Sequence, residues 1–437
     1  MSFVDLDRAA VARGLCLISD RPDDLVDVFF ERREEVEVPP SGETPGVRAW
    51  REEGLAVRLV RDRRQWLAVQ DDVSPEAFAD AVRRVARGLT QGVLRKPRIT
   101  VRGWGPVEIE EDQKSFAARV EAALRARRMV FPMRHRLRRH RRWVRVVDRT
   151  LAADAECESF FSCRIETRWG RWGALLSDLD ASAVSFVTEA LAASFRARSS
   201  APPSPSTTHL LLGPSAAAVF LHEAVGHALE VDTLALGGLP EAAVGLKLGS
   251  DVLDLLDDPT SGPEGLRRRT DDEGAPVLRR WLLRSGVVEQ PLADRAWARG
   301  SATLMSGAAR RQSRHLGPVP RSLHLELLAG QSSTAELAAQ PEAGVFASEA
   351  SRGRLDAETG EFFLEMPHGR LLANGQLGAR VGPFGVRGRV GDLLEKIRGV
   401  GQQPAFGGAG WCAKGGRRMP VWSTTPALLI EGVEVVS

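Results

Sequence analysis

The 437-residue sequence contains no tyrosine, only four cysteines and few lysines. Without tyrosine, no phenol from this chain can donate a hydrogen bond in a catalytic site. The four cysteines, with no secretion signal, predict reduced thiols in a bacterial-type cytoplasm and not a disulfide framework. Five lysines accompany 55 arginines among the 60 basic residues. This bias indicates codon usage more than function.

Net charge and long apolar runs are also scarce. The formal net charge of +3 is small for this length and does not indicate a nucleic-acid partner. The sequence starts with the acidic segment MSFVDLD, and it contains no apolar run long enough to cross a bilayer. We therefore expect a cytoplasmic protein with no membrane partner.

Two domains are expected, because the chain is longer than a typical single core supports. The Pro- and Ser-rich segment 196–208 has linker composition. It predicts an N-terminal domain at 1–200 and a C-terminal catalytic domain at 201–437. The expected fold class is α+β, with a mixed α/β N-terminal domain followed by a mostly antiparallel β domain that carries a metal-binding helix.

Hydrophobic patterns predict the individual elements. In the first half they predict strands at 27–31, 55–60 and 65–69, helices at 75–88, 113–128 and 182–195, and a hairpin of strands within 143–178. In the second half they predict strands at 210–212, 419–422 and 427–431, and one further clear helix at 390–398.

A basic cluster, RHRLRRHRR, occupies Arg134 to Arg142. Such a cluster can follow nucleic-acid phosphates. No nucleic-acid-binding fold is recognisable around it, so we favour a solvated connector in an arginine-rich protein. A surface that steers substrate or docks a partner is the remaining interpretation.

The strongest functional signal is the segment LHEAVGHALE at 221–230. Two histidines with a glutamate directly after the first are typical of a zinc hydrolase, in which neutral imidazoles hold the metal and the carboxylate acts as a base. His222 and His227 are five residues apart, which places them about 140° apart on an ideal helix. Both can reach one metal only if the helix is distorted, and a π-type bulge is expected near Gly226.

The same residues also have an ordinary explanation, because Glu223, His227 and Glu230 show the i, i+4, i+7 spacing of a polar helix stripe. The flanking sequence favours the metal. Residues 216–221 are wholly apolar, so the motif follows a buried helix. Ionisable groups there are costly unless they are paired or bind a metal.

The motif HEAVGHALEVD at 222–232 resembles the signature of the TldD/PmbA metallopeptidase family. Four further segments resemble that family in the same order: DDEGAP at 271–276, RR at 310–311 with PVPR at 318–321, DAETGEF at 356–362, and GWCAKGG at 410–416. The first half resembles the family only in its general pattern.

The resemblance implies that His222, His227 and Cys412 are the metal ligands and that Glu223 is the general base. A set of two histidines and one cysteine suits zinc and leaves a fourth position open, so Zn²⁺ is the expected cofactor. Since there is no tyrosine, arginine or histidine donors are left for the oxyanion. Arg310, Arg311 and His315 are the candidates on position alone.

The resemblance further implies a protease for unfolded or small peptides, as in leader removal from modified peptides. It implies a homodimer, or a heterodimer with an inactive paralogue, around an enclosed cavity. We hypothesise that an extended peptide adds as a strand beside the metal helix.

Three alternatives stay open. A zinc peptidase similar to dipeptidyl-peptidase III would use Glu273 as the third ligand, since this residue follows His227 by about the spacing such enzymes need. A non-catalytic scaffold subunit would bind no zinc. A modulator associated with nucleic acid is the least favoured.

Overall fold

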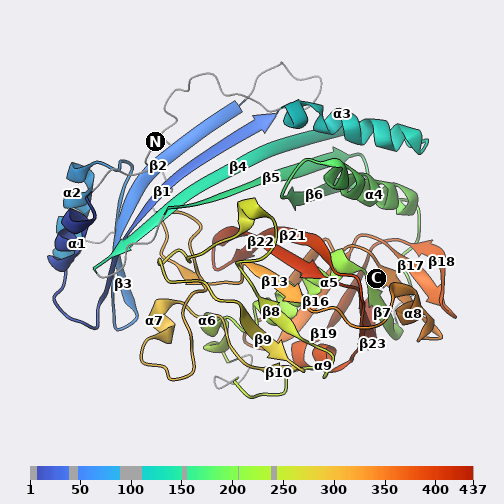
Figure 1. Cartoon of the computed structure of the whole chain (residues 1–437). Helices are drawn as coiled ribbons and strands as arrows, with labels where there is room; N and C mark the ends of the chain where they lie inside the picture. The colour runs from blue at the N-terminus through green and yellow to red at the C-terminus, as the bar shows by residue number, and fades with distance from the viewer. Residues whose placement is uncertain are drawn as a thin grey trace.

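The N-terminal half is built on one antiparallel sheet of six strands, in the order β3-β2-β1-β4-β5-β6 (Figure 1). The computed structural model describes residues 7–38, 48–88, 111–149, 155–204, 206–237 and 244–436. The strands of this sheet are β1 (Leu25–Val38), β2 (Arg48–Arg61), β3 (Arg64–Gln70), β4 (Met133–Asp148), β5 (Glu156–Thr167) and β6 (Gly170–Leu176). The sheet is curved and arches over the C-terminal half.

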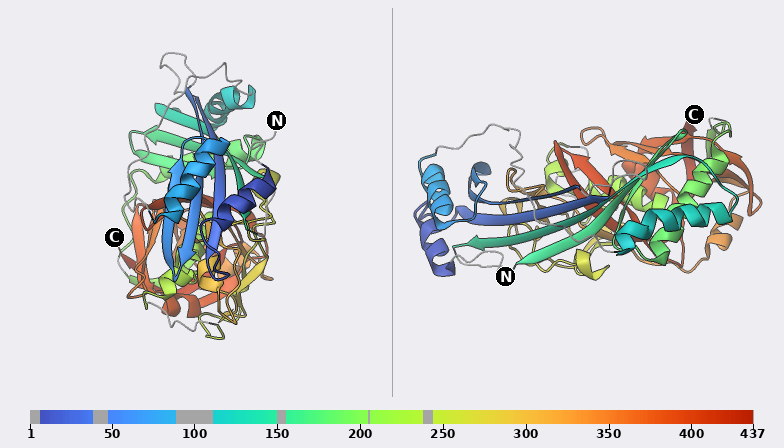
Figure 2. Two further views of the ribbon diagram at one scale, coloured as in Figure 1. Left: turned by 90° about the vertical axis from the view of Figure 1, so that its left-hand side faces the viewer. Right: turned by 90° about the horizontal axis from the view of Figure 1, so that it is seen from above.

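Two pairs of helices cover opposite ends of this sheet. The helices α1 (Arg8–Cys16) and α2 (Pro75–Ala86) share a core with β1, β2 and β3, at the end that extends past the C-terminal half (Figure 2). The helices α3 (Glu111–Ala126) and α4 (Ala181–Ala197) pack on β4, β5 and β6. Pro75 opens α2, and the Ser74 side chain accepts a hydrogen bond from the Ala77 amide, as an N-cap should. The predicted helices of this half are therefore confirmed.

The basic cluster at 134–142 is not a solvated connector, so that interpretation is wrong. It lies within β4, a central strand that pairs with β1 on one side and β5 on the other. The cross-strand neighbours in β1 include Glu34, Glu35 and Glu37, and Arg138 binds Glu35 and Glu37 at 2.9 and 2.6 Å. Every second side chain from His135 to Arg139 is buried. Opposite charges on adjacent strands stabilise this pairing, which the sequence of one strand alone could not show.

The C-terminal half contains two larger sheets and one two-stranded ladder. The nine-stranded sheet has the order β15-β16-β19-β23-β7-β14-β17-β18, with β20 also paired to β23, and the second sheet has the order β10-β9-β8-β13-β22-β21. Only the pairs β7–β14 and β13–β22 are parallel among the described strands.

The strands of the nine-stranded sheet are β7 (Ser206–Leu212), β14 (Ala343–Ala347), β15 (Arg352–Leu355), β16 (Glu361–Met366), β17 (Gly369–Ala373), β18 (Gln376–Val381), β19 (Phe384–Arg389), β20 (Ile397–Val400) and β23 (Leu428–Val436). Those of the second sheet are β8 (Leu255–Asp257), β9 (Arg280–Arg284), β10 (Val287–Val288), β13 (His324–Leu327), β21 (Ala405–Lys414) and β22 (Arg417–Thr425), and the ladder is β11 (Ala309–Arg310) with β12 (Val319–Pro320). The α+β class with a mostly antiparallel C-terminal half is confirmed.

The motif helix is buried in this half. The helix α5 (Pro214–Leu221) and the π-turn η1 (His222–Gly226) follow β7, and their apolar residues share one core with strands of both large sheets. The predicted helix at 390–398 is shorter, because α9 (Val390–Glu395) ends before Ile397, which is buried in β20. The remaining short helices are α6 (Val231–Leu234), η2 (Glu264–Leu266), α7 (Arg295–Ala298) and α8 (Thr334–Ala339).

Buried ion pairs join the two halves. Arg142 of β4 contacts Asp272 at 3.2 Å, Arg58 of β2 contacts Glu273 at 2.7 Å, and Arg311 contacts Asp27 of β1 at 2.9 Å. Separating a buried pair would leave a buried charge without a partner, which is costly. These pairs therefore oppose movement of the N-terminal sheet relative to the C-terminal half. The proposed boundary between 200 and 201 stays a prediction. No helix in the described ranges has the length and apolar character of a membrane span.

Candidate metal centre

The two motif histidines meet because the helix changes its pitch between them. Gly213 and Pro214 start α5, and the helix widens to a π-turn at His222–Gly226. The amide of His227 donates to the carbonyl of His222 over 3.0 Å, five residues back. A π-turn contains more residues per turn than an α-helix, so the angle around the helix axis between the two histidine side chains is smaller. The predicted bulge is confirmed, and the ring centroids are 4.6 Å apart.

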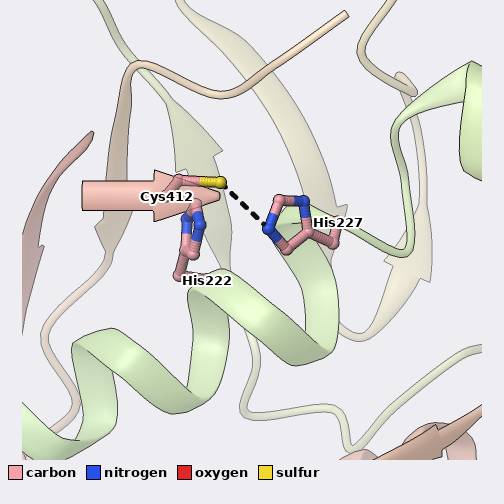
Figure 3. Close-up of side chains that lie close together, drawn as sticks. All are labelled: His222, His227 and Cys412. Carbon is pink, nitrogen blue, oxygen red and sulfur yellow. Dashed lines mark hydrogen bonds between the residues drawn. The ribbon is translucent and has the colours of Figure 1, made fainter. Parts of the chain in front are cut away.

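Cys412 completes the group from a distant strand. It lies in β21, beside the end of α5 (Figure 3). Its Sγ is 3.2 Å from His227 Nε2, and ligand atoms of His222, His227 and Cys412 all lie within 4.8 Å of one another. All three side chains are buried. The structure therefore brings together the three residues that the family resemblance implied.

The donor set fits a metal cation. His222 Nε2 is buried and has no hydrogen-bond partner in the part of the chain that the structure describes. Burial, followed by the charge of His227, lowers the pKa of His222 to about 3, so its ring is neutral and able to bind a metal. Burial opposes a charge on His227 as well, but Glu230 outweighs it and raises the His227 pKa well above its ordinary value. A positive charge is thus favoured in the space between Cys412 Sγ and the Glu230 carboxylate.

Glu230 orients His227 from behind. Its Oε2 lies 3.0 Å from His227 Nδ1 and 3.1 Å from the Arg321 guanidinium, and Lys414 also binds it. Burial disfavours ionisation of Glu230, but the charges of His227 and Arg321 outweigh it and lower its pKa to about 2. A carboxylate on the far nitrogen fixes the tautomer and direction of a metal-binding histidine. Sequence reasoning quoted Glu230 in the motif but gave it no role, although its position three residues after His227 was a usable signal.

Glu223 points to the same space without joining the ligand group. Its Oε2 is 3.9 Å from His227 Nε2, and 17% of its side chain is exposed. Burial is the main cause that raises its pKa above the ordinary value. A raised pKa suits a group that accepts a proton and later returns it near neutral pH.

The group opens into a cavity of about 1380 Å³ between the two halves. The walls include β4, β5 and β6 of the N-terminal sheet, the edge strand β15 with its neighbour β16, and the hairpin of β21 and β22. His222, Glu223, His227 and Cys412 all line it. A cavity of this size accepts several residues of an extended peptide.

The three residues predicted to bind substrate do not line this cavity. Arg310 donates to the carbonyls of Ser322 and Pro420, at 3.1 and 2.7 Å. Arg311 is fully buried against Asp27 and the ring of Phe29. His315 lies 4.0 Å from Asp71. Arg311 and His315 are thus part of the contact between the halves, whereas the hydrogen bonds of Arg310 stay within the C-terminal half.

Glu273 is also placed away from the metal group. Its carboxylate pairs with Arg58 at 2.7 Å and accepts a hydrogen bond from the Arg295 amide at 2.7 Å. The structure therefore gives no support to Glu273 as the third ligand. The DDEG segment at 271–274 instead contacts the N-terminal sheet through Asp272 and Glu273.

Comparisons with known proteins agree with this geometry. The family model described as the PmbA/TldA metallopeptidase C-terminal domain matches residues 205–437. The chain is 28% identical over 231 residues to the "Metalloprotease TldD homolog" of Buchnera aphidicola, covering 52% of this chain and 48% of that protein. It is 29% identical over 277 residues to the protein of the same name from Haemophilus influenzae, covering 63% and 58%. The chain thus spans about half the length of the curated relatives it matches.

A solved structure extends the likeness to the whole fold. The crystal structure of TldE from Thermococcus kodakarensis superposes with a TM-score of 0.73 at 18% identity. The match covers 98% of this chain and 99% of that one. The N-terminal sheet, which the family model does not reach, therefore has a known counterpart.

Proposed function

Because the chain belongs to the TldD/PmbA metallopeptidase family, we propose that it is a zinc-dependent peptidase that hydrolyses unfolded or small peptides. The observation that carries this proposal is the convergence of His222, His227 and Cys412 beside Glu223 in one cavity. A scaffold subunit would have no need of this buried donor set.

His222, His227 and Cys412 would hold the zinc. When bound, zinc supplies a Lewis acid that polarises the scissile carbonyl and makes water a better nucleophile. Glu230 keeps the Nδ1 proton of His227 in place, so that Nε2 faces the ligand group. The apolar helix α5 and the β21 strand hold the donors in position before any substrate arrives.

Glu223 would carry the proton transfer. Its Oε2 would accept the proton of the attacking water and then deliver it to the amide nitrogen of the leaving peptide. Its partial burial excludes most bulk water from this exchange while leaving one side open to the cavity. The raised pKa of Glu223 brings it closer to the operating pH of such a shuttle.

The walls of the cavity favour an extended substrate. The strands β15 and β21 are end strands of their sheets among the described residues, and both line the cavity. Edge strands offer free backbone donors and acceptors to a peptide that lies beside them. A folded protein cannot present its backbone in this way, so flexible tails, leaders and small peptides would be cut and folded domains spared.

The test uses one cleavable sequence and two forms of the enzyme. Glu223→Gln keeps the size of the side chain but removes the base, so zinc content should stay near one ion per chain while the rate falls on the order of 100-fold or more. Zinc is measured by elemental analysis and hydrolysis by mass spectrometry. A variant that cleaves at the native rate would exclude Glu223 as the base, and a purified native chain without metal would support the scaffold alternative.

The peptide is presented both free and within a stable folded domain. Faster cleavage of the free peptide is expected, and equal rates would exclude strand addition in the cavity.

A partner chain also belongs to this proposal. The chain would act as a homodimer or as a heterodimer with an inactive paralogue. The only support for an assembly of related chains is that the fold of this chain is similar to that of TldE. The mass of the native protein, measured by light scattering alone and with the paralogue from the same genome, separates the two forms.

A further inference from the structure

The cavity wall carries far more positive than negative charge. Nine arginines and Lys414 line it, against the three carboxylates Glu223, Asp232 and Glu365. The whole chain is nearly balanced, with 60 basic and 57 acidic residues. The excess is therefore a property of the cavity and not of the composition.

Most of these cations already have a carboxylate partner. The pairs are Arg136 and Arg138 with Glu37, Arg164 and Arg171 with Glu166, Arg321 and Lys414 with Glu230, and Arg352 with Glu365. Arg354, Arg417 and Arg418 remain, and they have no carboxylate within ion-pair distance in the described ranges of the chain. These three can offer their full charge to a ligand.

Arg417 and Arg418 lie close to the metal group. They begin β22 directly after the Gly415–Gly416 turn, and they pair in register with Lys414 and Ala413 of β21. Cys412 is the next residue along the same strand. Because side chains alternate along a strand, Arg417 shares the face of Lys414 and Cys412, and Arg418 shares the face of Trp411. A carboxylate bound at Arg417 would therefore belong to a substrate residue near the scissile bond, and one bound at Arg418 to a residue further along the cavity.

Neither side chain forms an ion pair with a carboxylate in the described part of the chain, although Asp232 lies near Arg417. Arg417 Nε is buried without a hydrogen-bond partner in the described structure, while Nη1 donates to the Gly415 carbonyl at 3.2 Å. The Arg418 guanidinium lies 4.7 Å from the centre of the Trp411 ring, which holds it toward the cavity. Burial lowers the pKa of each, and nearby arginines lower it further: Arg321 for Arg417, where Asp232 partly opposes the effect, and Arg164 and Arg138 for Arg418. An added carboxylate would relieve this repulsion.

We infer that Arg417 and Arg418 select peptides that place a carboxylate beside the β21–β22 hairpin, so that the substrates of this cavity are acidic. The inference rests on the proposed peptidase function. The carboxylate is either an Asp or Glu side chain or the C-terminus of the peptide, because both present the same two oxygens to a guanidinium.

A peptide fits this site better than a nucleic acid does. The unpaired cations lie within the cavity that Glu223 and the metal ligands share, and two edge strands there can pair with a peptide backbone. In β4, Arg136, Arg138 and Arg142 are already bound to glutamates of β1.

The experiment compares four peptides that differ only in charge: one with Glu beside the cleavage site, the same with Gln, the same with Lys, and the Glu peptide with an amidated C-terminus. Binding to zinc-loaded Glu223→Gln protein is followed by fluorescence anisotropy, and hydrolysis by the native protein is followed by mass spectrometry. The double variant Arg417→Gln/Arg418→Gln is compared with Arg387→Gln/Arg398→Gln, a pair of exposed arginines outside the cavity.

The Glu peptide should bind about tenfold or more tighter than the Gln peptide, the scale of one charge-assisted hydrogen bond. The cavity double variant should raise KM for the Glu peptide and remove this preference with kcat little changed, and the control pair should keep both. Weaker binding of the amidated Glu peptide than of the free Glu peptide assigns the carboxylate to the C-terminus, and a preference for Glu over Gln assigns it to the side chain. The preference of the native chain should also fall with added salt, which tests the inference without any variant.

Equal affinity for the Glu and Gln peptides, together with unchanged affinity on amidation of the C-terminus, would overturn the inference, as would an equal loss in the control pair or displacement of the peptide by an equimolar oligonucleotide. Acid-selective binding without hydrolysis would contradict the peptidase proposal alone. Hydrolysis without acid selectivity would contradict the selectivity alone.

Discussion

Gly353 of β15 lies so close to Glu223 that a Cβ atom at position 353 would be 2.4 Å from Glu223 Cγ. No side chain can occupy that space while Glu223 keeps its place. The edge strand β15 therefore fixes the position of the proposed base as well as forming the cavity wall. The glycine sits outside the quoted family segments, so sequence reasoning gave it no role.

Gly353→Ala should displace the Glu223 carboxylate and lower kcat on the order of 10-fold to 100-fold, because misplacement of a catalytic group by about 1 Å has effects of this size. Metal content should not change, since the three atoms nearest to the new methyl group all belong to Glu223 and not to a ligand. Gly391→Ala is the matched control, because no atom lies within 4 Å of its added Cβ. The prediction fails if both alanine variants keep the native rate.

Cys412→Ser should reduce bound zinc strongly, because the variant loses one of three protein ligands and replaces a thiolate with a weaker donor. Elemental analysis after dialysis measures the metal directly. Cys157→Ser is the control, since that cysteine is exposed and outside the ligand group. Full zinc retention in Cys412→Ser would remove this residue from the ligand set.

Glu230→Gln should lower zinc affinity about 10-fold to 100-fold, the usual cost of losing a carboxylate behind a ligand histidine. The change removes the charge that Arg321 and Lys414 also share, so some loss of stability is expected with it. Competition with a zinc-binding dye gives the affinity. An unchanged affinity in a folded variant would show that His227 needs no support from Glu230.

The contact between the halves should weaken in acid. Burial opposes ionisation of Glu31, but Arg33 and Arg142 outweigh it and lower its pKa to about 2. A lowered pKa in the folded state means that Glu31 stabilises the fold above its ordinary pKa of 4.5 and that this stabilisation is lost as pH falls toward 2. Urea unfolding of the native chain should therefore show falling stability over this interval.

Glu31→Gln should flatten that part of the profile and destabilise the chain at pH 7 by about 3 kcal/mol, because it leaves Arg142 buried with one partner fewer. Glu434→Gln, in an exposed pair with Arg387, should change stability by less than about 1 kcal/mol. An unchanged acid profile in Glu31→Gln would contradict this assignment.

The sequence by itself determined the local features. The π-turn between His222 and His227, the buried helix before it and the α+β class follow from residue spacing and apolar patterns. These depend on neighbours along the chain, so they can be predicted from one segment at a time.

The tertiary structure decided which distant side chains meet. It placed Cys412 beside the histidines, and it showed that Arg311 belongs to the contact between the halves and not to the cavity. It also showed that the basic cluster forms a central strand. Sequence patterns could not predict this, because the glutamates of β1 that neutralise Arg138 lie about a hundred residues earlier in the chain. The charge that a ligand meets depends on which cations are already paired, and pairing across sheets is set by register and packing. That is why the free arginines of the cavity emerged only from the folded chain.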